Sequence, residues 1–288
     1  MTLAEIQAAR ARIAPYVRRT PLHPLPEGPL LKLESLQVTG SFKPRGAFNY
    51  VLANSDACAG GVITASSGNH GQAVAYVAQT LGLRAVVVVP ETVAETKAAA
   101  ITRYGAELIR HGRYSDERIA LARELAERRR LHYIPPYDDP FIIAGQGTAG
   151  LEIVEQAPDL EVVLAPASGG GLLSGVAAAV KQLRPEVRVV GVEPEGAARF
   201  AASRRAGRPV TLERAETIAD GLRVLAPGRL PWELTARYVD EFKAVSDQAI
   251  LAAVRRILFD GRVLAEPSGA ASVACALLEG LTSPRVVA

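Results

Sequence analysis

The chain has 288 residues, of which 49% are hydrophobic and 22% are charged, and its formal net charge at pH 7 is +3. This balance is typical of a soluble globular protein, and so small a charge argues against a nucleic-acid-binding surface. No apolar run approaches the ~20 residues that span a bilayer, and Cys58 and Cys275 show no metal-ligand spacing, so we expect a cytoplasmic protein without nucleic-acid or membrane partners.

An opening helix is expected over residues 3–17; it is amphipathic, carries Glu5 and lacks the apolar core of a secretory signal. A proline-rich extended segment follows from Thr20, and residues 30–34 are expected to form a strand. The next helix is expected to start near Pro44 and to run to about residue 53. Proline suits the first helical turn because the N–H groups there have no partner inside the helix.

From residue 62 onward, short apolar strands alternate with amphipathic helices, which indicates an α/β fold with parallel sheets. The alternation pauses at residues 135–140, which look like a linker, and it loosens between residues 195 and 228. We therefore expect a large domain of residues 1–53 and 138–288, into which a small domain of residues 54–137 is inserted. The strands are expected at 62–65, 84–89, 107–109, 132–134, 161–165, 187–192, 239–245 and 286–288, and the helices at 69–81, 94–104, from 115, 147–156, 172–183, 247–259 and from 268.

Lys43 lies at the predicted N-terminus of the helix that starts near Pro44, next to Phe42. The positive end of a helix dipole disfavours the charged form of an amine. An uncharged lysine amine is a nucleophile that can form a Schiff base with a carbonyl. A lone lysine is more often a solvated surface residue, so the reactive interpretation depends on two loops elsewhere in the chain.

The first of these loops, Ser168-Gly169-Gly170-Gly171, follows a predicted strand and precedes a predicted helix. Its backbone N–H groups and the helix N-terminus favour a bound phosphate, and a plain turn rarely needs three adjacent glycines. The loop also approaches a dinucleotide fingerprint, with Ser174 where that pattern has glycine and Glu193 after the next strand. An NAD(P)-binding oxidoreductase is therefore an alternative.

The second loop, Ser66-Ser67-Gly68-Asn69-His70-Gly71, has the same setting between a strand and a helix and suits a carboxylate. The two serines are also ordinary helix caps, and His70 taken alone has a structural interpretation. A phosphate site, a carboxylate site and a reactive lysine together fit pyridoxal 5'-phosphate acting on an amino acid. A ligand-binding module without chemistry is the other alternative.

At these residues the chain resembles the fold-type II pyridoxal-phosphate enzymes, in the branch of threonine and serine dehydratases and serine racemase. The resemblance implies a tryptophan synthase β-like fold and a homodimer or homotetramer. It implies dehydration and deamination of L-threonine or L-serine to a 2-oxo acid and ammonia, with serine racemisation or elimination from hydroxyaspartate as alternatives. The matching stretches, in family order, are 41–47, 66–72, 168–172, 217–221 and 266–269.

The resemblance also implies a role for each matching position. Lys43 would bind the cofactor through an imine and then act as the base at the substrate α-carbon. Phe42 would pack near the cofactor ring, Asn69 would bond its phenolic oxygen, and Ser67 would donate a proton in racemisation. The substrate carboxylate would be held by Ser66, Ser67, Gly68, Asn69 and His70. The cofactor phosphate would be held by Ser168, Gly169, Gly170, Gly171 and Leu172.

The chain departs from the family pattern at two of these sites. Ser168 replaces the first of four glycines in many relatives, and its hydroxyl can still donate to phosphate. In the racemase branch a glutamate, a carbonyl four residues on and an aspartate six residues on bind a divalent cation. Here Glu193 is kept but the sixth position is Arg199, which would repel a cation. We therefore expect no metal and a pairing of Arg199 with Glu193.

A third departure concerns the end of the sequence. The chain stops at Ala288, before the family's Ser-Gly-Gly-Asn turn, whose serine faces the pyridine nitrogen, so the partner of that nitrogen is left unassigned. The sequence also carries no extension for a regulatory domain. We expect no feedback inhibition by a branched-chain amino acid through such a domain.

Overall fold

The computed structural model describes residues 1–283 and 285–288. The chain divides into two compact units: unit 1 is Met1–Arg10, Arg19–Ser35 and Tyr137–Ala288, and unit 2 is Ala11–Arg18 and Leu36–Pro136. The α/β class with parallel-rich sheets is confirmed. The predicted large domain included residues 11–18 and 36–53, whereas their contacts group them with unit 2, and Tyr137, predicted in the small domain, belongs to unit 1.

Helix α2 (Lys43–Ala53) belongs to unit 2 because it packs against α4 (Asn69–Thr80). The rings of Phe48 and Tyr76 meet edge to face, with centroids 6.0 Å apart. Phe48 is fully buried, so this contact is part of the core of unit 2. The apolar pattern of the helix did not indicate which domain its buried face would join.

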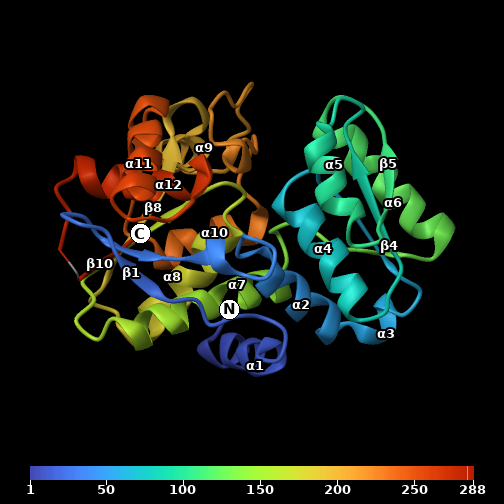
Figure 1. Cartoon of the computed structure of the whole chain (residues 1–288), viewed down its shortest axis with the longest axis horizontal. Helices are drawn as coiled ribbons and strands as arrows, with labels where there is room; N and C mark the ends of the chain where they lie inside the picture. The colour runs from blue at the N-terminus through green and yellow to red at the C-terminus, as the bar shows by residue number, and fades with distance from the viewer. Residues whose placement is uncertain (284) are drawn as a thin grey trace. The chain divides into compact units, whose positions relative to one another are not determined.

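The core of unit 2 is a parallel sheet that has helices on both faces (Figure 1). Its strands, in spatial order, are β5 (Glu107–Arg110), β4 (Ala85–Val89), β3 (Val62–Ala65) and β6 (His132–Tyr133). The remaining helices of the unit are α3 (Ser55–Cys58), α5 (Glu95–Thr102) and α6 (Ser115–Arg129). Val86 and Val88 of β4 pack against α6, whereas Val87 faces α4, so the whole strand is apolar.

Unit 1 contains a six-stranded sheet in which every pairing is parallel except that of β1 with β2. Its strands, in spatial order, are β1 (Leu22–Pro24), β2 (Leu30–Lys32), β10 (Val286–Val287), β7 (Val162–Pro166), β8 (Arg188–Pro194) and β9 (Glu241–Val245). The last strand of the chain therefore pairs in the interior of the sheet, between β2 and β7.

Helices cover both faces of this sheet. Those that pack on it are α7 (Pro140–Gln156), α8 (Gly171–Leu183), α11 (Asp247–Phe259) and α12 (Pro267–Leu278). Val163 and Val189 share a core with α7 and α8, whereas Val162 and Val190 share the opposite core with α11 and α12. Figure 1 shows α11 and α12, in orange and red, on one side of the strands and α7 and α8 on the other.

Most predicted elements are present with shifted ends, and three differences matter. The opening helix α1 (Leu3–Ile13) is shorter than expected. Helix α7 begins seven residues before the predicted position 147, at Pro140, because the side chain of Asp139 accepts hydrogen bonds from the N–H groups of Phe141 and Ile142. The linker-like segment thus ends in a helix cap.

The third difference lies in the stretch where the pattern loosens. It contains short 3₁₀ turns and α9, and α10 follows directly after it; neither helix was predicted. These elements are η2 (Glu195–Ala197), α9 (Arg199–Ala206), η3 (Asp220–Leu222) and α10 (Arg229–Tyr238). Within the described ranges, no helix has both the length and the apolar character that crossing a membrane requires.

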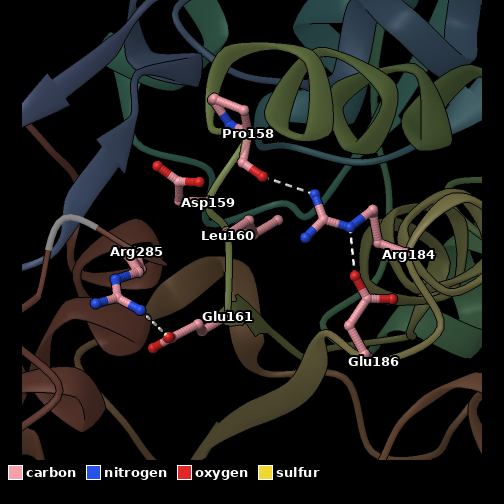
Figure 2. A pocket seen from close by; sticks show the side chains of 7 residues that line it. All are labelled: Pro158, Asp159, Leu160, Glu161, Arg184, Glu186 and Arg285. Carbon is pink, nitrogen blue, oxygen red and sulfur yellow. Dashed lines mark hydrogen bonds and ion pairs between the residues drawn. The ribbon is translucent and has the colours of Figure 1, made fainter.

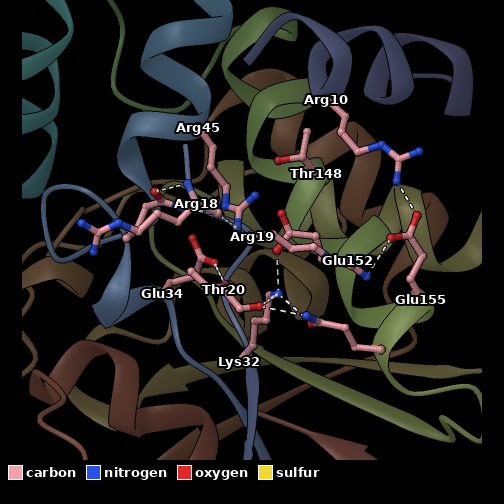
Figure 3. Close-up of polar contacts among 12 residues, drawn as sticks. Arg10, Arg18, Arg19, Thr20, Lys32, Glu34, Arg45, Thr148, Glu152 and Glu155 are labelled. Atoms are coloured by element: carbon pink, nitrogen blue, oxygen red, sulfur yellow. Dashed lines mark hydrogen bonds and ion pairs between the residues drawn. The ribbon is translucent and has the colours of Figure 1, made fainter. Parts of the chain in front are cut away.

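A buried ion pair fastens β2 to α7 (Figure 3). Lys32 Nζ donates to Glu152 Oε2 at 2.7 Å, to the carbonyl of Thr20 at 2.7 Å and to Gln156 Oε1 at 2.9 Å. Both charged side chains are less than one-tenth exposed. A buried pair is stable only when such hydrogen bonds replace the lost water, so this cluster fixes the register of α7 against the sheet.

Candidate active site

Lys43 is the first residue of α2, which confirms its predicted place at a helix N-terminus. Its Nζ donates a hydrogen bond to the carbonyl of Pro136 at 2.7 Å and lies 5.3 Å from the centroid of the Phe42 ring. The turn before the helix is closed by a hydrogen bond from Gly40 N–H to the carbonyl of Gln37, with Gly40 at φ +77°. The half-buried amine is thus held beside the start of the helix.

The loop from Ser66 to His70 joins β3 to α4 in the same unit. Ser66 Oγ accepts a hydrogen bond from Gly68 N–H at 3.3 Å. A Cβ on Gly71 would lie 2.1 Å from the carbonyl of Ser66, so only glycine allows the helix to start this close to the loop. Ser66, Ser67, Gly68 and Asn69 are partly exposed. The N–H groups of a first helical turn are available to an anion, which fits the predicted carboxylate site.

His70 is buried at the start of α4, and its Nε2–H donates to the carbonyl of Ile134 at 3.2 Å. Burial, together with the positive charge of Lys43, lowers the pKa of His70 to about 3. The imidazole is therefore neutral near pH 7. A substrate carboxylate would meet the backbone N–H of His70 rather than a charged ring, so the prediction that this residue holds the carboxylate concerns its main chain.

The loop from Ser168 to Gly171 joins β7 to α8 in unit 1. A Cβ on Gly169 would lie 2.4 Å from the ring of Tyr137, and one on Gly170 would lie 2.6 Å from the ring of Phe200. Gly170 also has φ +97°, a conformation that favours glycine. The glycines are therefore required by aromatic rings that pack directly on the loop.

Sequence reasoning missed the residues that surround this loop. Tyr137 stands in the segment interpreted as a linker, and Phe200 lies in the unpredicted helix α9. Gly228 donates its N–H to the carbonyl of Gly169 at 3.0 Å. Nothing local in the sequence marks these contacts, because each joins the loop to a segment at least 30 positions away. Leu172, the second residue of α8, is partly exposed.

The glycine loop fits a phosphate group. Ser168 Oγ is buried and has no hydrogen-bond partner among the residues that the structure describes, which is costly unless a ligand supplies one. The other hydroxyls in this condition belong to Thr39 and Ser41, in the loop before Lys43. A phosphate at the N-terminus of α8 would accept from Ser168 and from the loop N–H groups. Pyridoxal phosphate therefore suits these residues.

The predicted pairing of Glu193 with Arg199 is present in unit 1. Arg199 Nε lies 3.9 Å from Glu193 Oε1, and neither side chain is exposed. The carboxylate also accepts from the N–H groups of Phe200 and Ala201, each at 2.9 Å, and so caps α9. Burial raises the pKa of Glu193, while these N–H groups and Arg199 oppose the rise. In the described part of the chain, no group of three or more His, Cys, Asp or Glu side chains could hold a metal ion.

The two remaining motif stretches meet each other in unit 1. Gly221 N–H donates to Ser268 Oγ at 2.9 Å, which joins η3 to the start of α12. Thr217 and Ile218 bind the carboxylate of Asp247 at the start of α11. The stretches 217–221 and 266–269 are thus linked by hydrogen bonds at the starts of α11 and α12, which cover one face of the six-stranded sheet.

The residues of the near dinucleotide fingerprint already make hydrogen bonds or ion pairs within the protein. Ser174 is fully buried, and its hydroxyl donates to the carbonyl of Gly170 at 2.7 Å. Glu193 caps α9 and faces Arg199. It is therefore not available to bind a ribose hydroxyl, which a dinucleotide site needs at that strand end.

A surface pocket of unit 1 lies at the start of β7, at the end of the strand opposite to the glycine loop (Figure 2). Arg184 pairs with Glu186, and Arg285 pairs with Glu161. Because both arginines already pair with glutamates, this pocket is a poor site for a phosphate or a carboxylate. Ligands of parallel sheets bind at the carboxyl ends of the strands, where the glycine loop lies.

Comparison with known proteins decides among the alternatives. The family described as pyridoxal-phosphate dependent enzyme matches residues 13–288. The chain belongs to this family. This pyridoxal-phosphate dependent enzyme is 41% identical over 285 residues to the L-threonine ammonia-lyase of Thermotoga maritima, a match that covers 96% of the chain and 71% of the relative. It spans about half the length of the biosynthetic threonine dehydratases of Pasteurella multocida and Salmonella typhimurium.

Two solved structures extend the comparison. A threonine deaminase from the organism abbreviated T.th. is 43% identical, with a TM-score of 0.94, over 100% of this chain and 96% of that one. Maize serine racemase is 36% identical, with a TM-score of 0.95, over 99% and 91%. The predicted family, its fold type II architecture and pyridoxal phosphate as cofactor are confirmed. The NAD(P)-binding oxidoreductase and the ligand-binding module without chemistry are set aside.

Proposed function

We propose that this pyridoxal-phosphate dependent enzyme dehydrates and deaminates L-threonine, and also L-serine, to a 2-oxo acid and ammonia. The observation that carries the proposal is the match at 43% identity, over the whole chain, to a threonine deaminase. The L-threonine ammonia-lyase of Thermotoga maritima gives independent support at 41% identity. A cytoplasmic location and a homodimer or homotetramer belong to the same proposal and have the family resemblance as their only support.

Each candidate residue has a defined task in this proposal. When bound, the cofactor draws electrons away from the bonds of the substrate α-carbon. Lys43 Nζ would hold the cofactor covalently and, when free, would take the proton from the substrate α-carbon. The N–H groups of residues 66–70 hold the substrate carboxylate. Ser168 Oγ and the N–H groups of the glycine loop hold the phosphate.

The low pKa of His70 leaves the role of base to Lys43. An imidazole with a pKa of about 3 is a weak base, and burial keeps it neutral near pH 7, so it neither takes the proton of the α-carbon nor adds charge at the substrate site. The hydroxyl would leave the β-carbon with the proton that Lys43 took from the α-carbon, so that one water is lost, and hydrolysis of the resulting enamine would then release ammonia and the 2-oxo acid. Phe42 lies within 5.3 Å of the amine, measured to its ring centroid, and so is placed to pack beside a bound ring.

Serine racemisation is the second candidate function. The similarity to maize serine racemase supports it, as does Ser67, whose partly exposed side chain lies in the candidate carboxylate loop. In that reaction Ser67 Oγ would donate a proton to the face of the α-carbon opposite Lys43. Elimination from hydroxyaspartate is a weaker alternative because it is associated with the cation site that Arg199 replaces.

The test starts from the visible spectrum of the purified enzyme. Borohydride reduction followed by peptide mapping should place the cofactor on Lys43, and Lys43→Ala should lose both the absorption band and the lyase activity. Lys243→Ala is the matched control, because that lysine forms surface ion pairs. Product assays for 2-oxobutanoate, pyruvate and D-serine separate the reactions, and Ser67→Ala should remove racemisation alone. Cofactor trapped on another lysine would contradict the assignment.

A further inference from the structure

The guanidinium of Arg199 lies where three backbone carbonyls of unit 1 converge. Its Nη1 donates to the carbonyl of Ala167 at 2.8 Å, and its Nη2 donates to the carbonyl of Leu222 at 2.7 Å and to that of Ala197. The carboxylate of Glu193 lies 3.9 Å from Nε, and the arginine side chain is fully buried. Carbonyl and carboxylate oxygens are the ligands of hard divalent cations. Arg199 is therefore surrounded as a bound metal ion would be, and its guanidinium takes the place of that ion.

This internal cation is attached to the base of the glycine loop. Ala167 immediately precedes Ser168, and the residue after Arg199, Phe200, packs its ring against Gly170. Leu222 ends η3, in which Gly221 binds Ser268. One side chain therefore ties together the start of the loop, the turn before α9 and the motif stretch at η3.

We propose that Arg199 is a positioning residue for the cofactor phosphate, an internal cation that holds the glycine loop in shape and adds positive charge behind it. It makes an added divalent cation unnecessary at this position. The inference rests on the proposed assignment of the glycine loop as the phosphate site, and it goes further by naming a buried residue that acts on the phosphate through the loop.

The chain offers a built-in probe and a matched control. Trp232, the single tryptophan, donates its backbone N–H to the carbonyl of Gly228, and the backbone N–H of Gly228 in turn donates to the carbonyl of Gly169. Its fluorescence is therefore the readout that we choose for a change in the loop. Arg204, also on α9, donates to the carbonyls of Thr235, Val239 and Asp240 in the same manner as Arg199. These carbonyls lie around the end of α10 and the start of β9, and none of them belongs to the glycine loop or to the residue before it.

The first experiment titrates pyridoxal phosphate, and separately inorganic phosphate, into the protein freed of cofactor. Arg199→Met should weaken both affinities on the order of tenfold or more, the effect of removing one buried charge near a phosphate. Arg199→Lys should restore part of the loss. Arg204→Met should lower stability and leave both affinities within about twofold of the unchanged protein.

The second experiment introduces a competing cation. In Arg199→Asp two buried carboxylates face each other, and thermal stability should drop and then recover on addition of Mg²⁺ or Ca²⁺. The unchanged protein and Arg199→Met should gain nothing from either cation, and a chelator should not weaken phosphate binding by the unchanged protein. If Arg199→Asp does not fold, the chelator and the Met and Lys variants still decide.

Two results would overturn the inference: phosphate and cofactor affinities of Arg199→Met within about twofold of the unchanged protein, or a chelator that weakens binding by the unchanged protein. An Arg199→Asp variant that folds and is not stabilised by a divalent cation would also count against it. If the unchanged protein itself binds neither ligand at the loop, as reported by Trp232, the assignment of the phosphate site fails first, and the two failures are distinguishable.

Discussion

The contact between Gly169 and Tyr137 gives the most direct test of the glycine loop. In Gly169→Ala the new Cβ would lie 2.4 to 2.5 Å from three carbons of the Tyr137 ring, whereas ordinary contact begins at 3.4 Å. Ring or loop must therefore shift by about 1 Å, the difference between 3.4 and 2.4 Å. Gly169 does not have a positive φ, so alanine is allowed by the backbone and the effect is steric.

The expected cost follows from overpacking a filled site, which is about 1–3 kcal/mol of unfolding free energy. If the ring moves, the loss is mainly one of stability. If the loop moves, its N–H groups leave their places and the affinity for pyridoxal phosphate falls, on the order of tenfold for each charge-assisted hydrogen bond lost. Denaturant unfolding measures the first effect, and titration followed by Trp232 fluorescence measures the second.

A double-variant cycle isolates the clash. Tyr137→Ala removes the ring, so adding Gly169→Ala to it should cost less than adding it to the unchanged protein by about 1–3 kcal/mol. Gly269→Ala serves as a stability control, because it lies in α12 with no atom within 4 Å of the new Cβ among the described neighbours. Full additivity in the cycle, or a Gly169→Ala protein with unaltered stability and affinity, would refute the packing argument.

Three further predictions follow from buried charges and thiols. Folding lowers the pKa of His70 from 6.5 to about 3. Its contribution to stability is therefore present above pH 6.5 and is lost as the pH falls toward 3, by up to ~1.4 kcal/mol per pH unit. In His70→Gln the unfolding free energy should depend less steeply on pH between about pH 4.5 and 6.5, and equal slopes in the two proteins would contradict this. Burial raises the pKa of Cys58 and of Cys275 to about 11, so neither thiol should react with a thiol reagent at about pH 8 until the protein is unfolded. Lys32→Met should lower the unfolding free energy by about 3 kcal/mol or more, since it leaves Glu152 buried without its lysine. Lys243→Ala should lower it by less than ~1 kcal/mol. Similar losses in the two variants, measured by denaturant unfolding, would show that burial of the ion pair does not matter.

The fold class could be predicted because its main signals are local. Strand β4 is apolar at every position, and α11 begins and ends at the residues that its apolar periodicity predicts. The pattern of apolar residues alone therefore identifies both elements. Helix α9 was missed because its sequence has few apolar residues and its cap is the carboxylate of Glu193, which comes from the preceding strand. The start of α7 was missed although Asp139 and Pro140 form an ordinary start signal, because the surrounding prolines were weighed as a linker.

In the candidate site, too, some residues could be predicted from local signals and others could not. Lys43 and the glycines could be found because each sits at a junction of loop and helix, where backbone N–H groups have no internal partner. Tyr137 and Phe200 could not, since their importance lies in van der Waals contact with glycines far away in sequence. Small residues in a motif indicate that something approaches closely, but they do not say which side chain does so.

Charge is arranged differently in the two units, and the proposed chemistry uses that difference. In unit 2 the role proposed for Lys43 requires an amine without its proton, and the neighbouring His70 is neutral near pH 7 chiefly because it is buried. In unit 1 a phosphate needs positive surroundings, and Arg199 is a buried cation attached through Ala167 to the loop. Exchanging the two arrangements would change both sites: a charged residue at position 70 would place a second cation beside Lys43, and a neutral one at position 199 would leave the phosphate with the Ser168 hydroxyl and the backbone dipoles but no buried cation.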